Sequence, residues 1–285
     1  MPKRLRILLG PTGVGKTALG IRLAQQIGCP ILSCDSRQIY KELVIGTAAP
    51  TPEEQDGVPH YFIGSHSIHK HYTAGLYEIE ALALLDTLFQ FHDEVLMVGG
   101  SGLYIDAVCY GVDDFPPSDL ALRTLLTERL AREGIASLRF ELKRLDIESY
   151  RTIDIKNPQR VVRALEVTLQ TGRPFSSFKS HKPKERAFEI VKEGMMRNRA
   201  ELFAGIDARV DQMMEHGLLE EASTLIPYKK LPALRTVGYR ELFDYFDGKC
   251  TLESAILMIK QNSRRYAKRQ CSYWRRDNSI KWFGI

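Results

Sequence analysis

The segment that most constrains this chain is the glycine-rich run Gly10-Pro11-Thr12-Gly13-Val14-Gly15-Lys16-Thr17. It follows the apolar run Ile7–Leu9 and leads into a helical pattern over Ala18–Ile27, so it predicts a strand, a tight turn and a helix N-terminus. Glycines at this spacing let successive backbone N–H groups face an anion, while Lys16 adds a charge and Thr17 offers a hydroxyl to Mg²⁺. The run is therefore interpreted as a phosphate-binding loop. Its ligand stays open: a nucleoside triphosphate is the common one, and another pyrophosphate-bearing substrate satisfies the same donors.

Length and composition favour a soluble, cytoplasmic protein. The 285 residues suit one large domain or one domain with a sizeable insertion, and 44% of them are hydrophobic. No stretch is apolar for long enough to span a membrane, and the first residues lack the pattern of a signal peptide. The five cysteines form no C-x-x-C pair, which is typical of free thiols in a reducing compartment. The net charge of +5 favours a polyanionic partner, and no obligate protein partner is predicted.

Alternating strand and helix patterns predict an α/β fold with a parallel sheet flanked by helices. Two further apolar runs end in polar turns: one before Asp35-Ser36-Arg37-Gln38 and one before Gly99-Gly100-Ser101-Gly102. Ligands of parallel sheets bind beyond the carboxyl ends of the strands, so both turns are expected beside the phosphate loop. Asp35 is either a helix cap or magnesium-shell carboxylate, or it is a general base. Ser101 is either a simple turn residue or a hydroxyl that bonds the substrate.

A basic, helical tract interrupts this pattern after Pro116-Pro117. We predict a catalytic core over residues 1–115 and 187–285 and a helical insertion over 116–186. Helices in the insertion are expected at Leu120–Glu133, Ser137–Leu145 and Pro158–Thr171. Later helices are expected near Arg199–Glu215, Leu218–Leu225, Gly238–Phe246 and Leu252–Arg276, with strands at Phe188–Val191 and Ile280–Phe283. The last helix mixes arginines and lysines with aromatics, a pattern of RNA-binding surfaces as well as of solvated faces.

Taken in order, seven motifs are similar to those of the tRNA dimethylallyltransferase family, also called isopentenyl-tRNA transferases. They are Gly10–Thr17, Asp35–Tyr40, Ile45–Ala48, Gly99–Tyr104, Asn157–Glu166, Gly238–Glu241 and Ala267–Gln270. The resemblance spans nearly the whole chain. Ser101 stands where the family usually has threonine, which keeps the hydroxyl, and Ala49 stands where it usually has lysine. The zinc finger of eukaryotic relatives has no counterpart in the cysteine and histidine spacing.

The resemblance implies transfer of a dimethylallyl group from dimethylallyl pyrophosphate to N6 of the adenosine 3′ of a tRNA anticodon. Residues Gly10, Pro11, Thr12, Gly13, Val14, Gly15, Lys16 and Thr17 would then hold the pyrophosphate, with Mg²⁺ on Thr17. Asp35 would be the base, Ser101 would lie near the bridging oxygen, and Arg209 would contact the leaving group. The residues implied to bind the tRNA anticodon stem-loop are Asp35, Ser36, Arg37, Gln38, Ser101, Arg123, Gln159, Arg160, Val161, Val162 and Arg163. From composition alone Arg209 would instead be an ordinary solvated arginine on a helix.

Three other functions share parts of this pattern. A small ATP-dependent kinase would share the loop, the strand-end Asp35 and the size, but it leaves the basic insertion and the Ala267–Gln270 motif unexplained. An isopentenyltransferase acting on free AMP or ADP would have little use for an RNA-binding insertion. A non-catalytic RNA-binding switch would not need the Asp35 and Ser101 turns.

Overall fold

The computed structural model describes residues 2–179 and 182–284 of the chain, which forms two compact units. The core unit comprises Met1–Gly111 and Lys184–Ile285, and the helical unit comprises Val112–Pro183. These divisions lie three to four residues before the boundaries expected from the sequence. Lys184 belongs to the core unit because its backbone N–H donates to the carbonyl oxygen of Tyr110.

The core unit contains six parallel strands in the order β3-β2-β4-β1-β5-β6. The strands are β1 (Arg4–Leu9), β2 (Ile31–Ser33), β3 (His60–Tyr61), β4 (Glu94–Gly99), β5 (Glu189–Met196) and β6 (Lys281–Gly284). The central strand β1 pairs with β4 on one side and with β5 on the other. Because all pairs are parallel, the carboxyl ends of the strands lie at one edge of the sheet.

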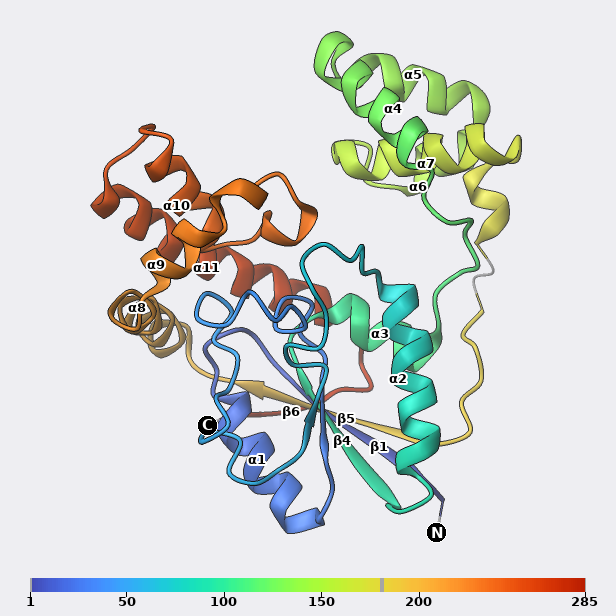
Figure 1. Ribbon diagram of the computed structural model, residues 1–285. Helices are drawn as coiled ribbons and strands as arrows, with labels where there is room; N and C mark the ends of the chain where they lie inside the picture. Colours follow the sequence, from blue (N-terminus) through green and yellow to red (C-terminus); the bar gives the residue numbers. More distant parts are fainter. Residues whose placement is uncertain (1, 180–181, 285) are drawn as a thin grey trace. The chain divides into compact units, whose positions relative to one another are not determined.

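Alternate residues of the strands supply the two hydrophobic layers of the core unit. Ile7 and Leu9 of β1 pack with helices α2 (Ala74–Leu88) and α3 (Gly102–Tyr110), whereas Leu8 packs with helix α1 (Lys16–Ile27). Figure 1 shows α1 and the α2–α3 pair on opposite sides of the sheet. All three of these β1 side chains are fully buried, as expected for a parallel sheet covered on both faces. The predicted α/β fold with a parallel sheet flanked by helices is confirmed.

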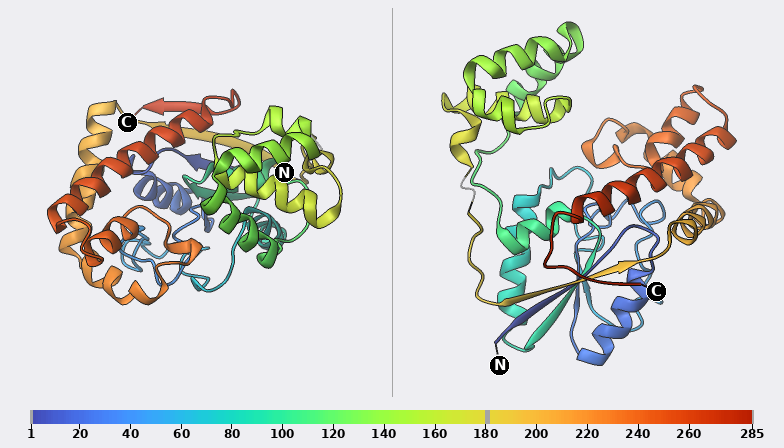
Figure 2. Two further views of the ribbon diagram at one scale, coloured as in Figure 1. Left: turned by 90° about the horizontal axis from the view of Figure 1, so that it is seen from above. Right: turned by 180° about the vertical axis from the view of Figure 1, so that it is seen from behind.

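Four helices follow β5 and complete the core unit. They are α8 (Arg199–Glu215), α9 (Leu218–Thr224), α10 (Tyr239–Phe246) and α11 (Leu252–Trp274). The side chain of Thr251 caps the first turn of α11 by accepting a hydrogen bond from the N–H of Ser254. Figure 2 shows α11, drawn in red, passing over the end of the sheet where the strands finish. This helix can therefore contribute side chains to a site at that edge.

The helical unit has its own core. Its helices are α4 (Leu120–Glu133), α5 (Ile135–Leu145), α6 (Ile147–Thr152) and α7 (Pro158–Thr171). The buried side chains Leu126, Leu142 and Leu165 join α4, α5 and α7. The short helix α6 was not expected from the sequence; its six residues are too few to show a periodic pattern. None of the helices described here is both long and apolar enough to cross a membrane.

Candidate active site

The glycine-rich loop joins β1 to the first turn of α1. Gly13 and Gly15 have φ angles of 80° and 99°, the left-handed region that favours glycine. Gly15 is the N-cap of α1 and has no side chain to bond the first N–H groups of the helix, which are free to face an anion. The Lys16 ammonium donates to the carbonyl oxygen of Pro11 at 2.9 Å, and its burial lowers the pKa of Lys16 to about 8. The exposed Thr17 follows it.

The turns after β2 and β4 are bonded to each other, as expected for neighbouring parallel strands. Ser101 is buried; its Oγ accepts a hydrogen bond from the N–H of Ser36 at 2.9 Å, and the two serine hydroxyls are 3.1 Å apart. The Oδ1 atom of Asp35 accepts hydrogen bonds from the N–H groups of Arg37 at 2.8 Å and Gln38 at 3.4 Å. Asp35 thus caps its turn, and Ser101 holds that turn against β4.

Glycine is required where these two turns meet. A Cβ atom on Gly99 would lie only 2.6 Å from Sγ of Cys34 and 2.7 Å from its carbonyl carbon. A side chain at position 99 would therefore push the Asp35 turn away from the Ser101 turn. The sequence pattern Gly99-Gly100-Ser101 follows from this close approach.

Arg209 of α8 reaches the phosphate loop from almost 200 residues away. Its guanidinium donates to Oγ1 of Thr12 at 3.3 Å and to the carbonyl oxygen of Thr47 at 3.4 Å. Burial lowers the pKa of Arg209, and the nearby carboxylate of Asp35 opposes that effect. The composition-based expectation of a solvated arginine is therefore wrong, because the packing of α8 directs this side chain toward the loop.

Three adjoining cavities line this edge of the core unit. The loop cavity, of about 530 Å³, is lined by Lys16, Thr17 and Arg209. The central cavity, of about 370 Å³, is lined by Thr12, Asp35 and Arg209. The tyrosine cavity, of about 560 Å³, is lined by Ser101 and by Tyr40, Tyr72, Tyr104, Tyr266 and Tyr273. Arg209 is common to the first two and Tyr266 to the last two, so the three cavities form a series along the strand ends.

Two residues that the sequence did not single out individually complete the site. Tyr266 of α11 lies between the central and tyrosine cavities, and burial raises its pKa to about 12, with a further contribution from Asp35. Gln270, also on α11, is buried; its Oε1 accepts from the N–H of Thr12 at 2.9 Å and its Nε2 donates to the carbonyl oxygen of Gly100 at 2.8 Å. One amide therefore joins the phosphate loop to the Ser101 turn. The Ala267–Gln270 motif was the only signal for it in the sequence.

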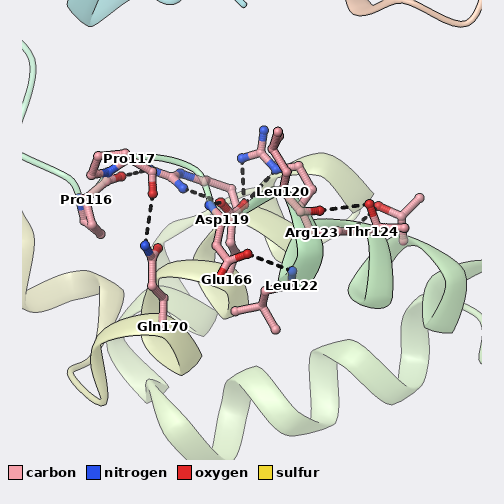
Figure 3. A network of polar contacts seen from close by, with 11 residues as sticks. Pro116, Pro117, Asp119, Leu120, Leu122, Arg123, Thr124, Glu166 and Gln170 are labelled. Carbon is pink, nitrogen blue, oxygen red and sulfur yellow. Dashed lines mark hydrogen bonds and ion pairs between the residues drawn. The ribbon is translucent and has the colours of Figure 1, made fainter.

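The helical unit holds the other residues that the resemblance assigned to tRNA. Glu166 of α7 is fully buried; its Oε2 accepts from Arg123 at 2.7 Å, and its Oε1 accepts from Arg163 at 2.8 Å and from the N–H of Asp119 at 3.1 Å. Figure 3 shows Arg123 and the start of α4 converging on Glu166. The side chains of Arg123 and Arg163 remain about 33% and 26% exposed, so each keeps part of its surface toward solvent.

The remaining members of that set differ sharply in exposure. Gln159 and Arg160 are exposed in the first turn of α7, which Asn157 caps by accepting from both of their N–H groups. Val161 and Val162 are buried in the core of the helical unit, so their side chains have no surface to offer to RNA. The assignment of Val161 and Val162 to the tRNA-binding set stays a prediction.

The acidic, cysteine and histidine side chains of the described residues do not gather into a metal site. Within residues 2–179 and 182–284, no three of them stand together in a way that could hold an ion. A magnesium ion held mainly by phosphate oxygens needs only one or two ligands from the protein. The exposed hydroxyl of Thr17 at the head of α1 fits that limited role.

The fold and the loop define a P-loop α/β protein with a site at the carboxyl ends of its strands. The chain belongs to the IPP transferase family, whose model matches residues 38–277. It is 52% identical to tRNA dimethylallyltransferase 2 of Porphyromonas gingivalis, over 98% of this chain and 93% of the relative. It is 50% identical to tRNA dimethylallyltransferase 1 of Bacteroides fragilis, over 99% and 93% of the two chains. The family resemblance drawn from the motifs is confirmed.

Solved structures agree with this assignment. The full-length tRNA isopentenylpyrophosphate transferase of Bacillus halodurans is 34% identical and has a TM-score of 0.72, with 99% of this chain and 90% of that chain covered. A eukaryotic dimethylallyltransferase crystallised in the act of modifying tRNA has a TM-score of 0.82, with 99% and 74% covered. Its identity is 24%, so this second likeness concerns the fold.

We predict that Gln270→Met lowers the free energy of unfolding by about 2 kcal/mol, because the N–H of Thr12 and the carbonyl of Gly100 lose their partner while the volume is nearly kept. Urea denaturation followed by tryptophan fluorescence measures the change. Gln261→Met, at an exposed position of the same helix, is the matched control and should change stability by less than about 0.5 kcal/mol. Equal losses in both variants would show that Gln270 does not join the two turns.

Glu166→Ala should destabilise the helical unit by about 3 kcal/mol, since it leaves two arginines and the N–H of Asp119 without their shared acceptor. Denaturation followed by the helical circular dichroism signal gives the value. The exposed Glu128 of α4 supplies the control, Glu128→Ala, which should stay close to wild type. A Glu166→Ala protein as stable as the control contradicts the network.

Proposed function

We propose that this chain transfers the dimethylallyl group of dimethylallyl pyrophosphate to N6 of the adenosine 3′ of a tRNA anticodon, releasing pyrophosphate. The observation that carries the proposal is the convergence of Lys16, Arg209 and Asp35 on adjoining cavities at one edge of the sheet. The first two side chains are suited to bind a diphosphate, and the third is suited to accept a proton. The names of the similar proteins from Porphyromonas gingivalis and Bacteroides fragilis agree with this reaction.

The phosphate loop would hold the diphosphate and stabilise it as a leaving group. As the bond between the allylic carbon and the bridging oxygen breaks, negative charge grows on the diphosphate, and fixed cations lower the energy of that state. Lys16 and the first N–H groups of α1 would bind from one side, and Arg209 would bind from the other. The Thr17 hydroxyl, with diphosphate oxygens, would hold Mg²⁺, which supplies additional positive charge to the leaving group.

The adenosine would supply the nitrogen that forms the new bond. Its amine lone pair is delocalised into the ring, so orientation and proton removal matter more than intrinsic nucleophilicity. Asp35 would accept the proton that N6 loses. Since its Oδ1 already binds two N–H groups of its turn, we assign the transfer to its Oδ2.

Base and donor would meet inside the series of cavities. The base must leave its stack, at a cost of a few kcal/mol that is smallest in a loop such as the anticodon loop. The five tyrosines of the tyrosine cavity offer rings on which a base can stack. Ser36, Arg37 and Gln38 would contact it from the Asp35 turn, and Ser101 would lie near the bridging oxygen. Closure of this space around the substrates would limit attack by water on the allylic carbon.

The helical unit would bind the anticodon stem-loop through exposed arginines and one glutamine. Arg160 and Gln159 present their side chains at the head of α7, and Arg123 and Arg163 each keep an exposed face. Arginines that contact phosphates release counterions, which makes affinity depend on salt. An acceptor as small as AMP would leave these side chains without a role.

The decisive experiment gives the full chain unmodified tRNA with either dimethylallyl pyrophosphate or ATP and analyses the tRNA nucleosides by mass spectrometry. The proposal expects adenosine that has gained one dimethylallyl group, together with stoichiometric pyrophosphate. Incubation with AMP as the acceptor tests the alternative small substrate. Label transferred from the γ-phosphate of ATP, or modification of AMP alone, would refute the proposal.

Asp35→Asn should lower the rate of transfer by at least about a hundredfold, because the amide can still cap the turn but cannot accept the N6 proton. Affinity for tRNA, measured by filter binding, should stay within about threefold of wild type. Asp35→Ala should lose transfer as well, with an added loss of order in the turn. Near-normal turnover of the asparagine variant would remove Asp35 as the base.

Arg160→Ala should weaken tRNA binding and reduce the slope of log affinity against log salt by about 0.7 to 0.9, the value for one lost phosphate contact. Binding titrations at four or five salt concentrations give this slope. Arg22→Ala removes an exposed arginine of α1 outside the predicted RNA-binding set and serves as the control. If both variants keep the wild-type slope, Arg160 does not contact the RNA.

A further inference from the structure

A segment without regular secondary structure separates the loop cavity from the central cavity. We call residues 44–48 the partition loop; it contains the Ile45–Ala48 motif, to which neither the sequence nor the proposed reaction gives a role. Gly46 and Thr47 line the central cavity, whereas Val44, Ile45 and Ala48 line the loop cavity. The loop therefore forms a wall shared by the two spaces.

A single carboxylate of α9 holds this loop. Glu221 Oε2 accepts hydrogen bonds from the N–H groups of Val44 at 3.1 Å and Ile45 at 2.8 Å. Its Oε1 accepts from the N–H of Gly46 at 3.0 Å and from the hydroxyl of Tyr239 at 2.5 Å. Three successive backbone donors thus converge on one anion, an arrangement that fixes the backbone of the loop.

Tyr239 brings a second unexplained motif, Gly238–Glu241, into the same cluster. Its side chain is fully buried, and burial raises the pKa of its hydroxyl, with Glu221 adding to the effect. A Cβ atom on Gly46 would lie only 2.6 Å from the Tyr239 ring. The glycine of the first motif and the tyrosine of the second are therefore required by the same contact.

The partition loop in turn holds two side chains of the site. The carbonyl oxygen of Thr47 accepts from Arg209 at 3.4 Å and from Nε2 of Gln38 at 3.2 Å. The carbonyl oxygen of Ala48 also accepts from Nε2 of Gln38, at 3.0 Å. Ala48 adopts a φ of 45°, which is uncommon for a residue with a side chain. The backbone that orients these carbonyl groups is therefore strained and depends on surrounding contacts to keep its conformation.

We infer that Glu221 is a positioning residue of this enzyme: through the partition loop it sets Arg209 on the donor side and Gln38 on the acceptor side of the reaction. The inference rests on the proposed function, which defines the donor side and the acceptor side. Within the part of the chain that the structure describes, Glu221 forms no hydrogen bond with the phosphate loop or the Asp35 turn. It acts through the backbone carbonyl groups of the partition loop, on which the positions of both Arg209 and Gln38 depend.

The test compares Glu221→Gln with Glu220→Gln. Both changes remove one negative charge from α9, but Glu220 is exposed and belongs to none of the cavities. An amide at position 221 keeps one acceptor oxygen. Its NH₂ group replaces the second oxygen and cannot accept hydrogen bonds from the donors that bind there. Small misplacements of reacting groups are costly, so the single-turnover rate at saturating substrates should fall about tenfold to a hundredfold in Glu221→Gln. Calorimetry should also show weaker binding of dimethylallyl pyrophosphate alone.

A merely structural role would act differently. It would lower thermal stability and the fraction of competent protein, but not the single-turnover rate per site that binds the donor. Tyr239→Phe provides a milder second variant, because it removes one donor and leaves the three N–H bonds. It should lose about threefold to tenfold in the same rate, and it keeps the inference testable if Glu221→Gln does not fold.

The inference is overturned if Glu221→Gln, or Tyr239→Phe in its place, matches Glu220→Gln in both the rate per site and donor affinity. Should the wild-type chain transfer nothing to tRNA, the proposed reaction fails instead. Donor affinity then decides about Glu221 by itself: weaker binding in Glu221→Gln than in Glu220→Gln supports its control of Arg209, and equal binding contradicts it.

Discussion

The parallel pairing of β1 with β4 and β5 is the constraint on which the site depends. It brings the ends of strands to one edge, where the turns after β1, β2 and β4 must share a small space. Gly99 lets the last two turns touch, and Gln270 ties the first to the third through one buried amide. Each of the three polar turns is thus held by contacts with another part of the chain.

Positive charge is concentrated where burial disfavours it. Burial lowers the pKa of both Lys16 and Arg209, and Arg209 lowers that of Lys16 further, while Asp35 only partly compensates. An anion placed between the two cations would relieve both costs, which is how such a site favours a diphosphate over a neutral ligand. The same carboxylate that compensates these cations is the one assigned to remove a proton. In the proposed reaction, the distance of this carboxylate from the diphosphate would therefore affect both binding and chemistry.

The sequence predicted the periodic elements well and the long-range contacts poorly. The helices at Leu120–Glu133, Pro158–Thr171 and Arg199–Glu215 were predicted with the observed bounds; each begins after an aspartate or asparagine cap. Helix α6 is too short to show a period. The motifs identified Asp35, Ser101 and the phosphate loop as candidate site residues, because the local spacing of residues in the sequence is enough to recognise such motifs. The roles of Gln270 and Glu221 depend on backbone partners 170 to 258 residues away, for which spacing gives no signal.

The end of β4 also explains why this loop suits a reaction other than phosphoryl transfer. Many P-loop enzymes that transfer phosphoryl groups have an aspartate near the end of a strand beside the loop, where it holds Mg²⁺. Here that strand end is Gly99, and a Cβ at this position would collide with Cys34. The space that such a carboxylate would need is taken by the Asp35 turn, which Ser101 holds in place. The packing that excludes a metal-binding aspartate from β4 is therefore the packing that brings Asp35 to the site.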